Sequence, residues 1–307
     1  MLVTALHLFP VKSLGGTKVA SAVVEPWGLA GDRRWALVDA AGELVTARHE
    51  HQLLRLTGEV VDDDTIRITD RGDGASILVD TPLGLGPVPI GISRLPFASP
   101  ADVDVNQWLS ERMGTVLRLV WQEDPTLRSI SGARGGLPGE TLSLADAGPL
   151  LLVSEVSIAQ LSSWMAAETD EPDIADLDPD DLSDAEAQTP PAALDILRFR
   201  PNVVIDGEQP FEEDDWPQVR IGEVTFRTTM VCDRCVMTTI DPVTIAGGKE
   251  PIRTLARHRR WDRSTWFGTR LVAEGTLGTI HVGDEVAPLD GRGVSRRHAE
   301  GRETRGK

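Results

Sequence analysis

The sequence predicts a mainly β protein with a few helices, of the α+β class. Short runs rich in Val, Ile and Thr alternate with polar turns along most of the chain, as in proteins built from sheets. The 29 glycines and 20 prolines among 307 residues favour many short elements over a few long helices. Only three segments space their apolar residues as a helix does. A chain of this length can form two domains, each with its own hydrophobic core.

Strand patterns occur in both halves of the chain. The first run ends at Pro10 and is followed by a turn at Gly15 and Gly16, and a hairpin pattern surrounds Gly42. In order, we expect β-strands within residues 2–9, 17–26, 33–50, 56–70, 75–80, 199–206, 218–232, 235–244 and 279–289.

Three helices are expected. Residues 103–114 place four apolar side chains near helical spacing, and Asp104 is available as the N-cap. A second helix is indicated from Ser154 to Met165, where two serines lie at the start. A third is indicated more weakly at residues 250–260. These helices are short and separated by strand patterns, in keeping with the α+β class.

An acidic stretch rich in Asp, Glu and Pro lies at residues 168–190. Its low hydrophobicity and clustered like charge give it little to bury, so we expect a solvated or disordered insertion. A calcium site is the functional alternative, but the carboxylates lack the D-x-[DN]-x-[DN]-G spacing of a calcium loop. The C-terminal segment 291–307 is polar and basic, and we expect it to be a disordered tail.

The charge and the cysteine content exclude several classes of protein. A net charge of −17 argues against a nucleic-acid partner and against docking on anionic membranes. No apolar run approaches the roughly 20 residues that cross a bilayer, and the N-terminus lacks the features of a signal peptide. Two cysteines in the whole chain fit a reducing compartment. We therefore expect a cytoplasmic protein without a membrane partner.

The two cysteines, Cys232 and Cys235, form a C-x-x-C pair within TMVCDRCVMTTIDP, for which four interpretations compete. A structural zinc site needs four protein ligands, and the nearest histidine is His258. A thioredoxin-like redox pair would precede a helix, whereas the residues that follow favour strand and turn. Two buried core thiols are disfavoured by the charged Asp233 and Arg234. The fourth interpretation is one thiolate on a soft metal whose other ligands come from a cofactor. Spacing alone does not decide between the redox pair and the metal ligand.

Six segments of the chain, taken together, resemble the MOSC family, named after the C-terminal domain of molybdenum cofactor sulfurase. Within this family the likeness is greatest to the mitochondrial amidoxime reducing component and its bacterial relatives. The resemblance covers about residues 2 to 290, apart from the acidic insertion. In chain order the segments are FPVKSLGG, GLAGDRRWALVDAAGELVTAR, SLADAGPLLLVSEVSIAQL, FRPNVVIDG, CDRCVMTTIDPVTIAGGKEPIRTL and WFGTRLVAEGTLGTIHVGDEV.

The resemblance implies two β-barrel-like domains, at residues 1–122 and 123–290, with a molybdopterin cofactor between them. In the family the second cysteine of C-x-R-C binds molybdenum, which corresponds to Cys235, whereas Cys232 is not a ligand. The positions that correspond to cofactor contacts are Lys12, Ser13, Arg33, Ser154, Glu155, Arg200, Asn202 and Asp233.

These residue types suit an anionic, hydrogen-bonding cofactor. Guanidinium groups bind phosphate with two parallel hydrogen bonds, and the start of a helix at Ser154 and Glu155 offers free backbone N–H groups. Asp233 lies where relatives frequently have Ser. Each arginine also has a structural interpretation: Arg33 could stack on Trp35 or pair with the preceding aspartate.

The resemblance implies a molybdenum-cofactor oxidoreductase that reduces small N-hydroxylated compounds. The sequence contains neither a ferredoxin-like cysteine motif nor a Rossmann glycine motif, so we expect electrons from a separate flavin or iron–sulfur protein. Pyridoxal phosphate is not expected, because the sulfurase domain that uses it lies outside the resemblance. The alternative function is that of a carrier which holds molybdenum cofactor or sulfur on Cys235 and passes it on.

Overall fold

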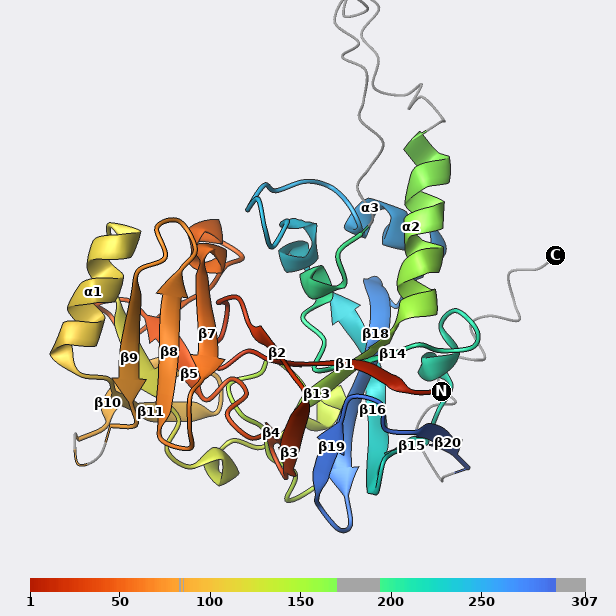
Figure 1. The fold of residues 1–307 in the computed structure, drawn as a ribbon, viewed down its shortest axis with the longest axis horizontal. Helices are drawn as coiled ribbons and strands as arrows, with labels where there is room; N and C mark the ends of the chain where they lie inside the picture. The colour runs from red at the N-terminus through yellow and green to blue at the C-terminus, as the bar shows by residue number, and fades with distance from the viewer. Residues whose placement is uncertain (83, 85, 170–193, 291–307) are drawn as a thin grey trace, which may run out of the picture.

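A computed structural model describes residues 1–82, 84, 86–169 and 194–290 (Figure 1). In these residues the chain forms twenty β-strands in four sheets, with three α-helices and six short 3₁₀ segments. The expected mainly β class is therefore confirmed. The 3₁₀ segments are η1 His51–Arg55, η2 Pro125–Leu127, η3 Gly132–Arg134, η4 Ile196–Phe199, η5 Glu212–Asp214 and η6 Val236–Thr239. Most of the acidic stretch, with the calcium alternative, and the segment 291–307 lie outside the described residues.

The largest sheet joins strands from both ends of the chain. Neighbouring strands are antiparallel except for β13 and β14, which are parallel, and the short β17 (Arg260–Trp261) pairs with β18. Across the sheet the order is β2 (Thr17–Val19), β1 (Val3–Leu8), β14 (Val203–Ile205), β13 (Leu150–Ser154), β18 (Ser264–Glu274), β16 (Val224–Arg234), β15 (Gln218–Ile221) and β20 (Val286–Leu289).

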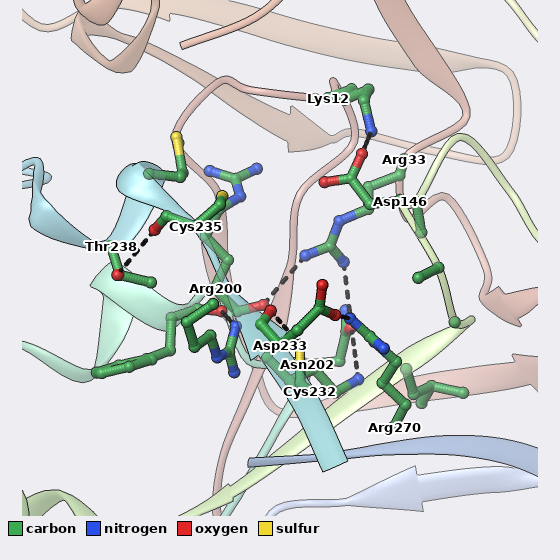
Figure 2. A pocket seen from close by; sticks show the side chains of 18 of the residues that line it. Lys12, Arg33, Asp146, Arg200, Asn202, Cys232, Asp233, Cys235, Thr238 and Arg270 are labelled. Carbon is green, nitrogen blue, oxygen red and sulfur yellow. Dashed lines mark hydrogen bonds and ion pairs between the residues drawn. The ribbon is translucent and has the colours of Figure 1, made fainter. Parts of the chain in front are cut away.

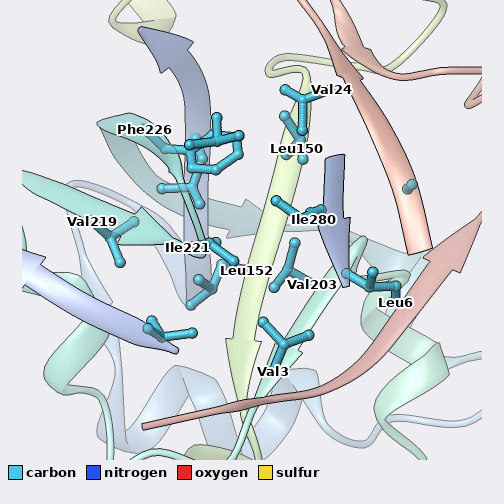
Figure 3. Packing of buried hydrophobic residues seen from close by; sticks show 14 of the residues in the cluster. Val3, Leu6, Val24, Leu150, Leu152, Val203, Val219, Ile221, Phe226 and Ile280 are labelled. Carbon is cyan, nitrogen blue, oxygen red and sulfur yellow. The ribbon is translucent and has the colours of Figure 1, made fainter. Parts of the chain in front are cut away.

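The strand β13 is buried on both faces of this sheet. Because alternate side chains of a strand point to opposite faces, Leu150 and Leu152 enter one core while Leu151 and Val153 enter another. The first core is closed by a three-stranded sheet, and Figure 3 shows its Val24 and Ile280 close to the large sheet. That small sheet has the order β19 (Thr279–His281), β3 (Ser21–Glu25) and β4 (Gly28–Leu29).

Two helices cover the other face of the large sheet. The helix α2 (Glu155–Thr169) contributes Leu161 and Met165, and α3 (Ile252–His258) contributes Leu255. These side chains pack with aromatic residues from β18, η4 and the start of η5, and with one of the two cysteines. That cluster also contains Phe199, Phe211, Cys232 and Phe267.

The remaining sheets are formed by the first part of the chain, beside α1 (Val103–Met113) (Figure 1). Their core also takes in Ile240 from the second half. The strands β10 to β12 were not expected from the sequence. One sheet has the order β10 (Val88–Ile92), β11 (Leu95–Pro100), β12 (Arg118–Trp121), β5 (Trp35–Val38) and β6 (Leu44–Val45), and the other β7 (Leu56–Val60), β8 (Thr65–Asp70) and β9 (Ser76–Asp80).

The sheets do not follow the expected division at residue 122. The strands β1 and β2 belong to the large sheet, and β3 pairs with β19 near the C-terminal end. The first 30 residues or so therefore pack on the second half of the chain. This arrangement brings the loop after β1 next to segments that lie about 190 residues later, as in the hydrogen bond between Arg200 and Leu14.

All three expected helices are present, with small shifts at their ends. The N-cap of α1 is Asp102, not Asp104, and the helix ends at the left-handed Gly114. The prediction of a strand at residues 235–244 is wrong, because the chain forms η6 there. The hydroxyl groups of Thr238 and Thr239 donate to carbonyl groups three residues earlier, and such local bonds compete with strand pairing. Among the described helices, none is long and apolar enough to cross a membrane.

A fully buried carboxyl group, Glu213, links η5 to the start of α2. The side chain is 0% exposed, and the hydroxyl group of Ser157 donates to it at 2.8 Å. Burial, with the neighbouring Asp214, raises the pKa of Glu213 from 4.5 to about 7. The unfolded chain releases this proton near pH 4.5, so the folded state holds more protons between pH 4.5 and 7. Stability must then fall as the pH rises through this window.

We predict that Glu213→Gln removes this loss of stability. A neutral amide keeps the shape of the side chain without a buried charge, so the free energy of unfolding at pH 8 should exceed that of the wild type by roughly 2–3 kcal/mol. Urea unfolding followed by circular dichroism from pH 4 to 8 measures this difference. Parallel pH profiles for the two proteins would contradict the assignment of the buried carboxyl group.

Candidate functional site

A cavity of about 240 Å³ lies where the loop after β1, the segment before β14 and the end of β16 meet (Figure 2). It gathers seven of the nine residues that the sequence analysis named as site residues. These residues come from positions that are up to about 220 residues apart in the chain, which the large sheet brings together. They are Lys12, Ser13, Arg33, Arg200, Asn202, Asp233 and Cys235.

The lining of the cavity is strongly positive, although the chain carries a net charge of −17. Two carboxylates, Asp146 and Asp233, face eight cationic side chains. A concave site lined by one sign of charge concentrates ions of the opposite sign. The site is therefore suited to an anion. The eight cationic residues are Lys12, Arg33, Arg48, Arg134, Arg198, Arg200, Arg234 and Arg270.

Asp146 holds two of these cations in place. Its carboxylate accepts hydrogen bonds from Lys12 and, at 2.6 Å, from Arg48. Burial alone would raise the pKa of Asp146, but Lys12 and Arg48 outweigh this effect and hold the pKa well below its usual range. The ammonium group of Lys12 also donates to the carbonyl of Leu144 at 2.8 Å. Two cations from the first part of the chain are thus fixed on a loop of the second part.

Both terminal nitrogens of Arg33 donate hydrogen bonds to other residues of the protein. One nitrogen lies 2.5 Å from the carboxylate of the buried Asp32 and 3.1 Å from the amide oxygen of Asn202. The other donates to the carbonyl of Arg200 at 3.0 Å. Of the structural alternatives for Arg33, the pairing with Asp32 is the one present, and the guanidinium lies 4.7 Å from the ring of Phe9. Arg33 positions the segment that carries Arg200 and Asn202.

Three other arginines that line the cavity each have a terminal nitrogen without a hydrogen-bond partner among the described residues. Arg200 donates to Leu14, Arg234 to carbonyl groups of the chain, and Arg270 to Asp233. Each keeps one buried terminal nitrogen that has no hydrogen bond to any described residue. A buried donor left unpaired costs about 1–3 kcal/mol, and more when it is charged. A ligand with several acceptor oxygens or nitrogens would satisfy all three.

The charge on Arg200 is costly in the absence of such a ligand. Burial, followed by the repulsion of Arg33, lowers the pKa of Arg200 to about 9. The guanidinium nevertheless remains protonated near pH 7, because its pKa lies above that pH. A bound anion would offset both effects.

Three of the eight non-glycine residues with positive φ in the described part of the chain line the cavity. Ser13, Arg33 and Arg200 have φ angles of 71°, 49° and 56°. These values lie in the left-handed region, which residues other than glycine rarely adopt. Such residues persist where the surrounding structure holds them, which is common at ligand sites. The three strained residues belong to the segments that approach the cavity from opposite halves of the chain.

The two cysteines have different environments. Cys232 is 8% exposed and packs in the cluster under α2 and α3. Cys235 is exposed, because β16 ends at Arg234 and the chain turns into η6. Arg48 lines the cavity with Cys235, and the charge of Asp146 raises the pKa of Arg48. The described residues contain no group of three or more His, Cys, Asp or Glu side chains that could hold a metal ion.

The bend that separates the cysteines is a bulge between β16 and β18. Val231 pairs with Thr269 but Asp233 pairs with Trp266, so the register shifts at Cys232. Across from it, Gly268 has a φ angle of 71°, and a Cβ atom there would lie 2.9 Å from the carbonyl oxygen of Leu152. Bulges of this kind re-aim side chains beside active sites.

Asp233 is a partner of arginines. Its carboxylate accepts from Arg134 at 2.7 Å and from Arg270. Burial would raise the pKa of Asp233, but Arg270 and Arg134 outweigh it and lower that pKa. The side chain therefore orients Arg270 at the wall of the cavity.

Ser154 and Glu155 are not brought into the cavity. The strand β13 begins at the cavity with Leu150 and Leu151 and carries Ser154 away from it, at about 3.3 Å per residue. Ser154 is bonded to Ser157 and Glu213, and Glu155 accepts from Thr4 at 2.8 Å. The correction follows from the direction of the strand, which the sequence pattern does not give.

Several lining residues were not expected as site residues. Arg234 lies inside the C-x-R-C motif, and Arg270 is the one charged residue of the segment WFGTRLVA, so both had a signal in the sequence. The others lie in loops or short 3₁₀ segments whose sequence gives no such signal. They are Arg48, Arg134, Asp146 and Arg198.

Over most of its length the chain is similar to mitochondrial amidoxime-reducing components and to molybdenum cofactor sulfurases. The chain is 29% identical over 302 residues to mouse mitochondrial amidoxime-reducing component 1, covering 92% of this chain and 81% of that protein. It is 28% identical to the human protein of the same name, again over 92% of this chain and 82% of that protein. It is 29% identical to rice molybdenum cofactor sulfurase, covering 92% of this chain but only 35% of the relative.

Two family models cover most of the chain. The MOSC N-terminal beta barrel domain matches residues 1–116, and the MOSC domain matches residues 139–287. Every cationic residue of the cavity except Arg134 lies within these matched ranges. Together the two matches show that this chain belongs to the MOSC family.

Proposed function

We propose that this protein binds the molybdenum cofactor and reduces small N-hydroxylated compounds, with Cys235 as the protein ligand of the metal. The observation that carries the proposal is the set of three unpaired guanidinium nitrogens, on Arg200, Arg234 and Arg270, in a cationic cavity that Cys235 also lines. The names of the relatives, an amidoxime-reducing component and a molybdenum cofactor sulfurase, support the same assignment.

The residues present fit the chemistry of this cofactor. Molybdopterin carries a phosphate and a pterin with several hydrogen-bonding atoms, and a cavity with excess guanidinium donors suits both. Lys12 and Ser13 at one wall, and Arg200, Arg234 and Arg270 at the others, would hold it. Asn202 would stay in place through its bonds to Arg33 and to the carbonyl of His7. Arg33 and Asp233 would position these groups.

The chain's own residues would orient the metal and stabilise its thiolate ligand. When bound, the cofactor supplies the two-electron redox chemistry that removal of an N-bound oxygen requires. The substrate R–NHOH takes up two electrons and two protons and yields R–NH₂ and water. Arg48 lines the same cavity as Cys235 and brings positive charge from the first part of the chain to this point.

The electrons would come from a separate flavin or iron–sulfur protein, since the sequence holds neither a ferredoxin-like cysteine motif nor a Rossmann glycine motif. We propose a cytoplasmic location for this reaction. The second candidate function is a carrier of molybdenum cofactor or sulfur. Two observations favour it. The thiol of Cys235 is exposed, and 92% of this chain aligns with the rice molybdenum cofactor sulfurase.

The first prediction concerns the two cysteines. Cys235→Ser should abolish molybdenum retention, because a hydroxyl group is a poor substitute for a thiolate on a sulfur-ligated metal. Cys232→Ser, the matched control, should keep most of the metal, because that sulfur is packed in the core. Metal analysis of the purified variants decides the question, and equal loss from both would rule out a single ligand.

The second prediction concerns the unpaired arginines. Arg200→Ala and Arg234→Ala should each weaken cofactor binding by roughly 1.5–3 kcal/mol, the range for hydrogen bonds to charged groups. Arg200→Lys should restore only part of the affinity, because a lysine cannot form two parallel bonds. Arg34→Ala is the control, since Arg34 bonds to Gln122 and does not line the cavity. Unchanged cofactor occupancy in both alanine variants would remove these residues from the site.

The third prediction concerns the source of electrons. NADH or NADPH alone should not support reduction of benzamidoxime by the cofactor-loaded protein, whereas reduced viologen or a cognate flavin or iron–sulfur protein should. Cys235→Ser serves as the control for reduction by free viologen. Fully loaded wild-type protein that reduces no N-hydroxylated compound with viologen would favour the carrier function.

A further inference from the structure

Cys235 lies between two cavities. Besides the inner cavity described above, a second depression of about 380 Å³ lies outside it. Among the residues that the structure describes, Arg234 and Cys235 alone line both. If the inner cavity holds the cofactor, the outer depression is where a substrate reaches the metal. Its volume lies within the range of small-molecule sites, about 300–1,000 Å³.

The outer depression has a positive rim and an apolar wall. Three of its lining residues, Arg234, Lys249 and Arg253, are cationic, and none of the described residues that line it is acidic. Val236, which is 51% exposed, and Ile252 supply apolar surface beside Cys235. An apolar surface beside a few charged groups suits a small organic molecule that carries a charge.

The donors of Lys249 and Arg253 are available to a ligand. The side chain of Lys249 is exposed and makes no hydrogen bond or ion pair with the described residues. Glu250 accepts from Nε of Arg253 at 2.6 Å, which fixes the guanidinium. The two terminal nitrogens of Arg253 have no hydrogen bond within the described part of the chain. The carboxylate of Glu250 therefore orients Arg253 and leaves the terminal nitrogens of Arg253 available to a ligand.

We propose that this depression binds the anionic group, a carboxylate or phosphate, of an N-hydroxylated substrate through Lys249 and Arg253. The inference rests on the proposed function and adds the substrate class. The chain as a whole carries a net charge of −17, which disfavours small anions over most of its surface, so a local positive rim selects for them beside Cys235. Val236 and Ile252 contact the apolar body of the substrate.

The test compares two substrates that differ in one charge. Benzamidoxime is neutral near pH 7, and 4-carboxybenzamidoxime carries a carboxylate. With reduced viologen as donor, the wild type should show a higher kcat/KM for the anion. In the double variant Lys249→Gln/Arg253→Gln the ratio of the two kcat/KM values should fall about tenfold. Salt at about 0.5 M should lower the wild-type ratio as well, because it screens the partly exposed pairs.

A matched control lies on the same helix. Arg257 of α3 pairs with Glu168 at 2.9 Å and does not line the depression, so Arg257→Gln should leave the ratio unchanged. A ratio in the double variant equal to that of the wild type would overturn the inference. If the same variant were then slow only with a cognate electron-transfer protein, the basic rim would be a protein-docking site.

A binding measurement separates this inference from the proposed function. Ligand-observed NMR can compare 4-carbamoylbenzoate with neutral benzamide, neither of which is reduced. The anion should bind the wild type more tightly, and the double variant should lose that preference. Protein that reduces neither amidoxime but keeps this preference would refute the proposed reaction and leave the anion site standing. Equal binding of the two compounds to the wild type would refute the anion site.

Discussion

The structure depends on the burial of positive charge around one internal cavity. Eight cationic side chains and two carboxylates line it, and Asp32 and Asp241 pair with two of the cations from outside the lining. Guanidinium groups removed from water need counter-charges or acceptors, and the three unpaired nitrogens show that the described residues do not supply enough. The lowered pKa of Arg200 has the same origin. An anionic ligand with many acceptors is the simplest group that completes this arrangement.

The same charges hold the two halves of the chain together. Lys12 and Arg48 reach Asp146, and Arg33 reaches the backbone of Arg200. These contacts cross the interface where the large sheet takes in the first strands of the chain. Because polar contacts rather than apolar packing line this part of the interface, its geometry is set by specific pairs of groups. A cofactor bound there would contact both halves and stabilise their association.

The sequence predicted the class of fold, the three helices and seven cavity residues, because each depends on local patterns or on short motifs. It did not predict how β16 and β18 pair, and that register places Arg270 opposite Met230 and beside Asp233. It also misplaced Ser154 and Glu155, because the direction in which β13 leaves the cavity is a property of the sheet. The turn after Cys235 was missed because β-branched residues suggest a strand. In the structure the hydroxyl of Thr238 instead donates to a nearby carbonyl, which favours a turn.

The most direct test of the central claim is anomalous diffraction at the molybdenum absorption edge, from crystals of protein purified with its natural metal content. The account predicts a single strong peak within bonding distance of the sulfur of Cys235. Cofactor density should also fill the cavity against Arg200, Arg234 and Arg270. Stoichiometric molybdenum located away from Cys235, with the arginine-lined cavity holding only solvent, would contradict it.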